Sequence, residues 1–206
     1  EDETLFSWCG RLAGFHAAMP CQDWLRMMEI SQHSVIDHDP ATVDRLAALT
    51  GFSTSLVMAC GFRRLGDRTF GLGDKTFSQY FAQRSQTTYC PACLLEDRDQ
   101  ASPSAGQRVG RLSWMFKPVR TCPRHGTLLL RRAQEGHHEK FQDMNRVAPE
   151  DQALEELVRG AEPRSVSRLQ QYTQTRLARG PGSAWLDGQR IDQGTKACEM
   201  LGAVLE

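Results

Sequence analysis

The chain has 206 residues, and its 25 Lys and Arg are matched by 25 Asp and Glu, so the formal net charge is zero. A dedicated high-affinity DNA-binding protein is usually basic, so this balance argues against DNA as the only partner and leaves protein partners open. No apolar run approaches the roughly 20 residues of a membrane-spanning helix, so no membrane partner is expected. The length allows one medium-sized domain or two small ones.

Residues 1–82 are expected to form a helical region with a helix-turn-helix-like bundle. Apolar residues recur at helical spacing in two stripes: Leu5, Trp8, Cys9, Leu12 and Phe15, then Trp24, Leu25 and Met28. Cys9 is interpreted as a core thiol. Pro40 or Ala41 should begin a further helix. The polar, Gly-rich residues 66–75 predict a loop.

Residues 46–57 have the pattern of a helix-turn-helix. The small Ala47 allows two helices to cross closely, Gly51 suits a turn that needs a positive φ, and Val57 would pack the second helix onto the first. One interpretation is that the second helix enters a DNA groove. The candidates for DNA contact are then Ser53, Thr54, Ser55, Arg63 and Arg64, with Met58 on the same helix.

A helical hairpin that only packs, or that docks to another protein, is the alternative for residues 46–57. Before Arg63 the second helix carries no Lys, Arg, Asn or Gln, which are the side chains that hydrogen-bond best to base edges. The composition therefore favours packing or protein docking over base readout.

Two short motifs carry the clearest chemical signal: Cys90-Pro91-Ala92-Cys93 and Cys122-Pro123-Arg124-His125. Two donors separated by two residues let backbone amides turn inward while both side chains converge on one ion. Cys90, Cys93, Cys122 and His125 together supply three thiolates and one imidazole, a tetrahedral set that zinc prefers and that leaves no coordination position open. The sequence therefore predicts one structural Zn²⁺.

Two other interpretations are open for these motifs. Cys90 and Cys93 could be buried apolar cysteines with His125 at the surface, which leaves the spacing as coincidence. A redox pair would need the Cys-x-x-Cys motif at the start of a helix in a βαβ unit, and that pattern does not surround Cys90. The adjacent His137 and His138 are the first substitutes if His125 is not a ligand. Reduced thiols with zinc fit a cytoplasmic protein better than a disulfide framework does.

Residues 83–133 are expected to form a zinc-binding module built on a small β-ribbon. The alternation of Leu112, Trp114 and Phe116 predicts a strand with one buried face, and residues 128–130 predict its partner strand. Because the module has little apolar area of its own, it should need the metal to fold.

Residues 134–148 are interpreted as a linker and residues 149–206 as a C-terminal helical region. The predicted apolar stripes there are Leu154, Leu157 and Val158; Val166, Leu169, Tyr172 or Thr173, and Leu177; and Ala197, Cys198, Leu201, Val204 and Leu205. Gly180-Pro181-Gly182 should end the second of these helices, and Trp185 and Leu186 should anchor the next loop. The last stripe runs to the end of the sequence, which suggests that the natural protein continues beyond Glu206. The predicted fold class is mainly α, with a zinc-stapled β-ribbon between two helical regions.

The sequence carries no pattern typical of an enzyme. An acidic triad for two-metal chemistry, a Walker phosphate loop and a nucleophile elbow are all missing from it. Residues 71–76 resemble the end of a phosphate loop but lack its glycine spacing and its preceding apolar strand. A zinc hydrolase would keep one coordination position free for water, whereas the four predicted ligands fill the shell.

Four segments of the chain together resemble the TniQ family. They are Leu5-Phe6-Ser7-Trp8-Cys9-Gly10-Arg11-Leu12-Ala13; residues 46–53; the metal-binding region, with Tyr89-Cys90-Pro91-Ala92-Cys93-Leu94-Leu95-Glu96-Asp97, Trp114 and Thr121-Cys122-Pro123-Arg124-His125-Gly126-Thr127-Leu128-Leu129; and residues 182–188 with 198–202. The metal-binding region is the specific part of the likeness. Many members have a further Cys-x-x-Cys pair after it, where this chain has Arg131-Arg132-Ala133, so a second metal site is not expected.

The resemblance implies a non-enzymatic target-selection adaptor in DNA transposition. Such a protein links a target, either DNA itself or an RNA-guided CRISPR complex, to an AAA+ ATPase that recruits the transposase, often as a homodimer. A zinc-containing helix-turn-helix transcriptional regulator built on residues 46–57 is the alternative.

Overall fold

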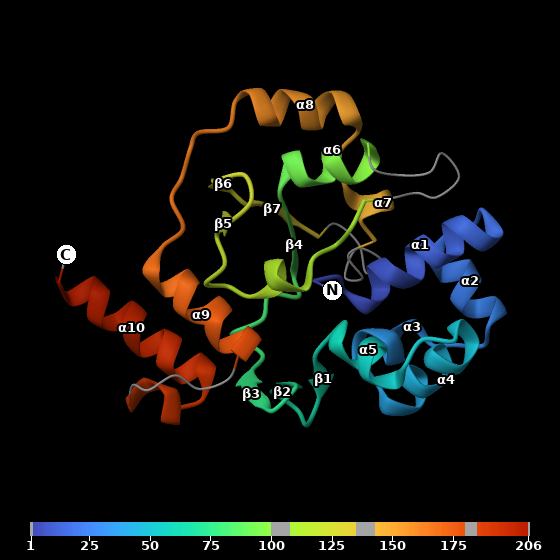
Figure 1. Cartoon of the computed structure of the whole chain (residues 1–206), viewed down its shortest axis with the longest axis horizontal. Coiled ribbons are helices and arrows are strands. Elements are labelled where there is room, and N and C mark those ends of the chain that lie inside the picture. Colours follow the sequence, from blue (N-terminus) through green and yellow to red (C-terminus); the bar gives the residue numbers. More distant parts are fainter. Residues whose placement is uncertain (1, 100–107, 135–142, 180–184, 206) are drawn as a thin grey trace.

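The computed structural model describes residues 2–99, 108–134, 143–179 and 185–205. Helices dominate these ranges, and the strands form small antiparallel sheets, so the predicted mainly α fold class is confirmed (Figure 1). Buried apolar side chains gather in two clusters, one among the N-terminal helices and one around the sheets and the helices that follow them.

The N-terminal helical bundle contains five helices. They are α1 (Leu5–Ala17), α2 (Cys21–Met27), α3 (Gln32–Ile36), α4 (Pro40–Thr50) and α5 (Thr54–Ala59). Side-chain oxygens of Thr4, Asp39 and Ser53 accept the backbone N–H three residues later and so begin α1, α4 and α5. The apolar faces of these helices meet in one core, in which Cys9 is fully buried as predicted.

A three-stranded antiparallel sheet follows the bundle, in the order β1 (Arg63–Arg64), β2 (Thr69–Leu72) and β3 (Lys75–Ser78). The prediction of a loop over residues 66–75 is therefore wrong, because β2 and the start of β3 lie within this range. Gly73, with φ of 58°, supplies the tight turn between the two strands. Phe70 pairs with Phe77 across them, and both rings are buried in an aromatic cluster.

The segment that carries the two Cys motifs forms two separate two-stranded sheets. β4 (Gln86–Tyr89) pairs with β7 (Leu130–Ala133), and β5 (Thr121–Cys122) pairs with β6 (Thr127–Leu128). Helix α6 (Pro91–Asp99) follows β4 directly. The predicted partner strand at residues 128–130 is thus divided between β6 and β7, with the buried Leu129 between them.

The prediction of a strand around Trp114 is wrong. Leu112, Trp114 and Phe116 are all buried as expected, but residues Leu112–Met115 form the 3₁₀ helix η1. The N–H groups of Trp114 and Phe116 bond to carbonyls three residues earlier instead of to a neighbouring strand. A short 3₁₀ turn that leads into an extended residue can bury every second side chain, as a strand does. The alternation of apolar residues alone therefore could not distinguish a 3₁₀ helix from a strand.

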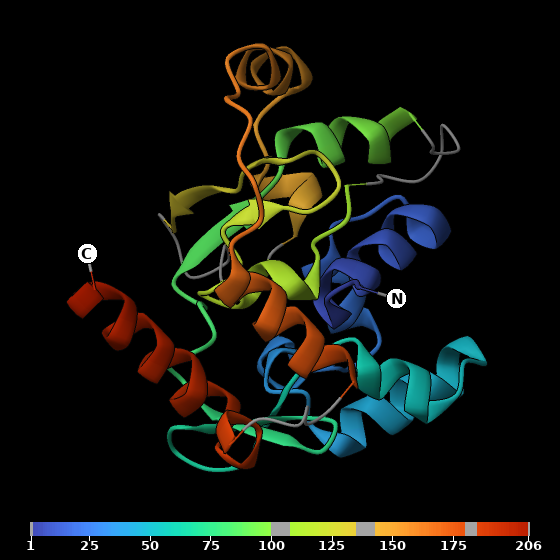
Figure 2. The same cartoon turned by 60° about the vertical axis from the view of Figure 1, so that its left-hand side comes forward.

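The C-terminal part packs against the metal-binding segment. It contains α7 (Met144–Val147), α8 (Asp151–Arg159), α9 (Arg168–Arg179), the 3₁₀ helix η3 (Trp185–Gly188) and α10 (Ile191–Leu205). Helix α8 lies against α6, and α10 lies against α9 and β3 (Figure 2). Met144, Leu154 and Ile191 are fully buried in the same core as Cys90 and Cys93, and burial of side chains of this size contributes about 1.5–3 kcal/mol each.

Several predictions for the C-terminal stripes need correction. The buried face of α9 is polar, formed by Gln170, Thr173 and Arg176, while Leu169 is only partly buried and Val166 precedes the helix. Trp185, which was expected to anchor a loop, is 71% exposed, and Leu201 on α10 is 58% exposed. Gly180-Pro181-Gly182, His137-His138 and most of the predicted linker lie outside the described residues, and the linker's described end forms α7.

In the described part of the chain, each helix is either too short or too polar to cross a lipid bilayer.

Candidate metal centre

The first Cys motif lies where β4 passes into α6. Cys90 follows the last residue of β4, and Pro91 opens the helix, a position where the missing N–H and fixed φ of proline are favourable. Cys93 therefore lies in the first helical turn, and its side chain faces the same point as that of Cys90. The backbone N–H of Cys93 donates to the Cys90 sulfur, as the inward-turning amides of this spacing predict.

The second motif lies in the loop between β5 and β6. Cys122 ends β5, the N–H of Gly126 donates to the Cys122 carbonyl at 2.9 Å, and Gly126 has a φ of 59° that favours glycine. The backbone N–H of His125 donates to the Cys122 sulfur, which repeats the arrangement of the first motif. The tight turn brings Cys122 and His125 to one side of the loop.

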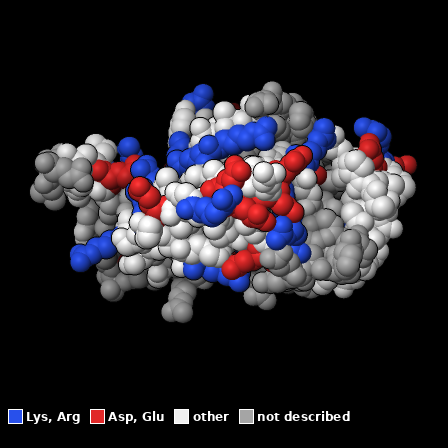
Figure 3. All heavy atoms as spheres, turned by 90° about the horizontal axis from the view of Figure 1, so that it is seen from above, with Lys and Arg blue, Asp and Glu red and all other residues white. Residues whose placement is uncertain are grey.

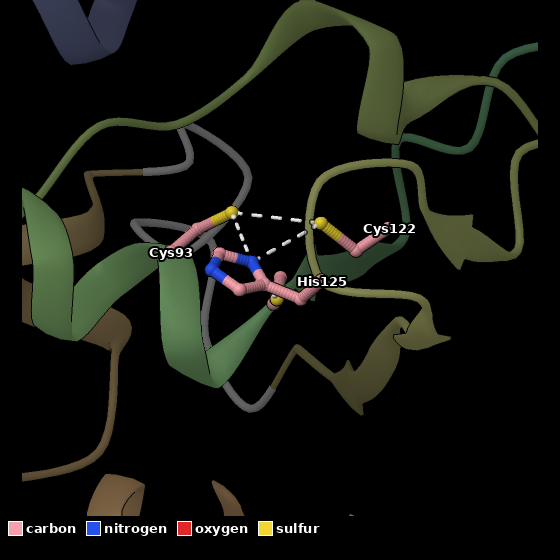
Figure 4. Close-up of side chains that lie close together, drawn as sticks. Cys93, Cys122 and His125 are labelled. Atoms are coloured by element: carbon pink, nitrogen blue, oxygen red, sulfur yellow. Dashed lines mark hydrogen bonds between the residues drawn. The ribbon is translucent and has the colours of Figure 1, made fainter. Parts of the chain in front are cut away.

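Cys90, Cys93, Cys122 and His125 meet in space, with their donor atoms all within 4.8 Å of one another. Nδ1 of His125 lies 3.5, 3.3 and 3.5 Å from the sulfurs of Cys90, Cys93 and Cys122, and the sulfurs of Cys93 and Cys122 are 3.6 Å apart. Figure 4 shows the side chains from α6 and from the β5–β6 loop pointing toward one another. A sulfur separation of 3.6 Å excludes a disulfide, whose S–S bond is about 2.05 Å.

The electrostatics of the cluster suit a cation. Hydrogen bonds from the side chains of Cys90 and Cys93, and from the backbone N–H of His125, lower the pKa of Cys122. The pKa of Cys93 is raised, mainly by its contact with the Cys122 sulfur and next by its contact with the Cys90 sulfur. Three buried sulfurs this close repel one another as thiolates. A divalent cation among them would remove that repulsion, so the four residues fit a metal ion in both donor type and distance.

Glu96 contacts the candidate metal centre, and sequence analysis missed it. Its Oε1 lies 3.0 Å from Nε2 of His125, and its Oε2 lies 3.0 Å from Nη2 of Arg124. A carboxylate that accepts a hydrogen bond from Nε2–H keeps the imidazole proton on Nε2, which leaves Nδ1 free as the metal-binding nitrogen. The available signal was the position of Glu96 three residues after Cys93 on the same helix, which places both on one face.

Charged side chains of both signs cover the face above the metal centre. Arg98 of α6 and Arg108 both contact Asp151 of α8, at 3.0 and 2.5 Å. Figure 3 shows positive and negative side chains interleaved over this face. Carboxylates therefore lie among the cations on the described part of this face, whereas a surface that attracts nucleic acid is mainly positive.

The C-terminal chain also covers the β5–β6 loop. The N–H of Arg164 donates to the carbonyl of Gly126 at 2.6 Å, and Thr127 forms an isolated antiparallel β-bridge with Pro163. The side chain of Gln170 accepts the N–H groups of Arg120 and Thr121 and donates to the Thr121 carbonyl. Residues that follow the two motifs therefore hold the second motif in place.

A comparison with known protein families bears on this arrangement. The family model of TniQ matches residues 1–129, more than half of the chain. The chain belongs to the TniQ family. The match contains all four donors of the metal centre and the helix-turn-helix unit, and it ends before α7. Membership of the TniQ family associates the protein with DNA transposition and the selection of its target site. No curated protein matches the chain.

The helix-turn-helix of this TniQ protein consists of α4 and α5. Gly51 has a φ of 75° between them, and Ala47 and Val57 are buried where the two helices meet. The three candidate DNA contacts at the start of α5, residues 53–55, are all exposed, and the hydroxyls of Ser53 and Ser55 bond to each other. Helix α5 has only six residues.

Arg63 and Arg64 do not extend α5, because they form the exposed strand β1. Nη1 of Arg64 lies 3.5 Å from Oδ2 of Asp37. The structure therefore brings residues 53–55 together on one short helix and places the two arginines on a different element.

Proposed function

We propose that this TniQ protein is a non-enzymatic target-selection adaptor in DNA transposition, which carries one structural zinc ion. It would link a recognised target, either DNA itself or an RNA-guided CRISPR complex, to an AAA+ transposition ATPase, alone or as a homodimer. The observation that carries the proposal is the family match over residues 1–129, which contain the whole metal centre.

The spacing of the donor atoms supports zinc. Tetrahedral zinc with Zn–S about 2.3 Å and Zn–N about 2.0–2.1 Å requires sulfurs about 3.8 Å apart and sulfur–nitrogen separations of about 3.5 Å. In the structure, the sulfurs of Cys93 and Cys122 are 3.6 Å apart, and each sulfur lies 3.3–3.5 Å from Nδ1 of His125. Cys90, Cys93, Cys122 and His125 would fill the shell, so the ion would hold α6 to the β5–β6 loop and leave no place for a catalytic water.

The surface of the helix-turn-helix supports docking to protein more than to DNA. Three apolar side chains are exposed on and beside α4 and α5: Leu49, Phe52 and Leu56. Contact of Ser53, Thr54, Ser55, Arg63 or Arg64 with DNA phosphates stays part of the proposal, as an auxiliary contact. A transcriptional regulator gains no comparable support, because six-residue α5 offers no side chain suited to bidentate base readout.

Two measurements test the proposal. The purified chain is passed over a size-exclusion column with the AAA+ ATPase encoded beside a transposase in the same genetic element, and its binding to duplex DNA is measured across a salt series. An adaptor co-elutes with the ATPase, and one that acts through a CRISPR complex also binds duplex DNA weakly. Nanomolar, sequence-specific binding with a steep salt dependence, and no ATPase capture, would contradict the proposal.

A further inference from the structure

A hollow of about 670 Å³ lies away from the metal centre, between α3, the β1–β2–β3 sheet and the segment after η1. Three cations line it: Arg64, Arg84 and Lys117. Among its described lining residues, Asp37 is the only carboxylate. The described lining therefore has an excess of positive charge, in contrast to the interleaved charges over α6 and α8.

Asp37 orients two of these cations without neutralising both. Its Oδ1 accepts from Nη2 of Arg84 at 3.1 Å and its Oδ2 from Nη1 of Arg64 at 3.5 Å. The guanidinium of Arg84 also lies 5.1 Å from the centre of the buried Phe70 ring. Guanidiniums that are already held in place lose less conformational entropy when they bind an anion such as phosphate.

Tyr80 stands at the edge of the hollow as an exposed aromatic platform. Its side chain is 62% exposed, and Nζ of Lys117 lies 5.8 Å from the centre of its ring. Backbone bonds from Phe81 N–H to the Ser78 carbonyl and from Lys117 N–H to the Phe81 carbonyl fix the two segments against each other. The backbone thus holds the two residues that carry the aromatic ring and the ammonium group next to each other.

We propose that this hollow binds single-stranded nucleic acid, with phosphates on Arg64, Arg84 and Lys117 and a base stacked on Tyr80. A positively charged groove combined with an exposed aromatic ring is the chemistry that binds unpaired bases and their backbone. Bases in a duplex are already stacked and cannot use the ring. The volume is within the roughly 300–1,000 Å³ of small-ligand sites, enough for a nucleotide unit.

A second hollow of about 620 Å³ shares Tyr80 and Lys117 with the first and continues toward α10. Its lining contains the carboxylates of Asp192 and Glu199 against the ammonium groups of Lys117 and Lys196, so it lacks the positive excess of the first hollow, which phosphates therefore favour. The site is separate from α5, shares only Arg64 with the DNA contacts of the proposed function, and does not depend on the proposed link to an ATPase.

Fluorescence anisotropy with the full chain tests the site. The probes are fluorescein-labelled dT12, U12 and a duplex of the same length, each titrated at several salt concentrations. Replacing Tyr80→Ala should weaken binding of single strands by about fivefold or more, with little effect on the duplex, while Tyr80→Phe should retain the affinity. Lys117→Ala should weaken single-strand binding and reduce the salt slope by about 0.7, the value for one phosphate contact. Tighter binding of dT12 or of U12 shows which nucleic acid is preferred.

Arg26→Ala is the matched control, because Arg26 is an exposed arginine on α2 that pairs with Asp23 outside the hollow. It should change neither the affinity nor the slope, and all variants should keep the wild-type melting temperature. The site is refuted if Tyr80→Ala binds dT12 and U12 as tightly as wild type, or if Arg26→Ala loses as much as Lys117→Ala. Polyglutamate is also used as a competitor. If it displaces the oligonucleotide equally well from Tyr80→Ala and from wild type, the hollow binds an acidic peptide and the proposal is overturned. Failure to capture the ATPase would count against the proposed function alone.

Discussion

Glu96 and His125 form a hydrogen bond of 3.0 Å between Oε1 and Nε2, which directs Nδ1 of the imidazole toward three sulfurs. Helix α6 thus supplies one sulfur donor, Cys93, and the carboxylate that sets the tautomer of the histidine. The candidate metal centre therefore consists of four donor side chains and one carboxylate that supports them.

Glu96→Ala should reduce metal affinity by about 10–100-fold, because outer-shell carboxylates fix the orientation and basicity of a ligating imidazole. Glu96→Gln should lose less metal affinity, since its amide oxygen can still accept a hydrogen bond from Nε2–H. Competition with a chromophoric zinc chelator measures the affinity. Glu155→Ala is the control, because Glu155 is an exposed residue of α8 whose contact is with Arg98 at 3.9 Å. Equal affinities of Glu96→Ala and wild type would show that the contact does not support the metal.

Cys93→Ser should abolish stoichiometric zinc and lower the melting temperature. Structural zinc contributes on the order of 10 kcal/mol to small zinc domains, so loss of one thiolate should cost several kcal/mol of stability. Elemental analysis and thermal unfolding give the two readouts. Cys198→Ser, in α10 and distant in sequence from both motifs, should keep one zinc per chain. Bound zinc and unchanged melting in Cys93→Ser would defeat the assignment.

Gln170→Leu should destabilise the contact between α9 and the β5–β6 loop. Gln170 is 1% exposed and satisfies two backbone N–H groups and one carbonyl, of Arg120 and Thr121. Each buried polar group left without a partner costs about 1–3 kcal/mol, so the total loss should be at least about 2 kcal/mol. Urea unfolding measures it. Gln171→Leu, at the exposed next position, should stay within about 0.5 kcal/mol of wild type, and a similar loss in both variants would contradict the explanation.

Gly51→Ala should cost about 1 kcal/mol because Gly51 has a φ of 75°, where a Cβ is strained. Gly66→Ala is a matched control. A Cβ at either glycine would meet nothing within 4 Å, and Gly66 has no such φ, so only backbone conformation distinguishes the two sites. Chemical unfolding of both variants separates the effects. Equal stability of the two would show that the turn between α4 and α5 tolerates a side chain.

Stability should fall in mild acid because of His38. Its side chain is buried, its Nε2 lies 2.8 Å from the Met58 carbonyl, and burial lowers its pKa below 6.5. The unfolded chain therefore takes up this proton at a higher pH than the folded chain does. The contribution is fully present above about pH 6.5 and is lost as the pH falls toward the lowered folded-state pKa.

His38→Asn removes the titrating group and suits the positive φ of 54° at this position. Between pH 7.5 and 5.5, with saturating zinc, its melting temperature should fall less than that of wild type. His16→Asn, at an exposed position of α1, controls for the loss of a histidine and should follow the wild-type curve. Parallel curves for His38→Asn and wild type would remove His38 from the explanation.

The sequence alone predicted the features that depend on short-range spacing. The spacing inside each of the two donor motifs and the helix-turn-helix around Gly51 both follow from residues within one or two turns of one another. Burial at Leu112, Trp114 and Phe116 was also predictable. In these cases local backbone geometry, which the sequence sets directly, decides the outcome.

Long-range packing decided what the sequence could not. At Trp114 a 3₁₀ helix replaces the predicted strand because the N–H groups of Trp114 and Phe116 bond to carbonyls three residues earlier, and Gln170 can be buried because the backbone of Thr121 meets its amide. The contact of Glu96 with His125 and the position of Tyr80 beside Lys117 join residues about 30 or more positions apart. Such pairs are favourable only after the chain has folded, because a polar side chain is stable inside a protein only where distant segments bring it a partner. Local spacing thus specified each of the two donor pairs, and the tertiary structure decided that the pairs meet and which side chains support them.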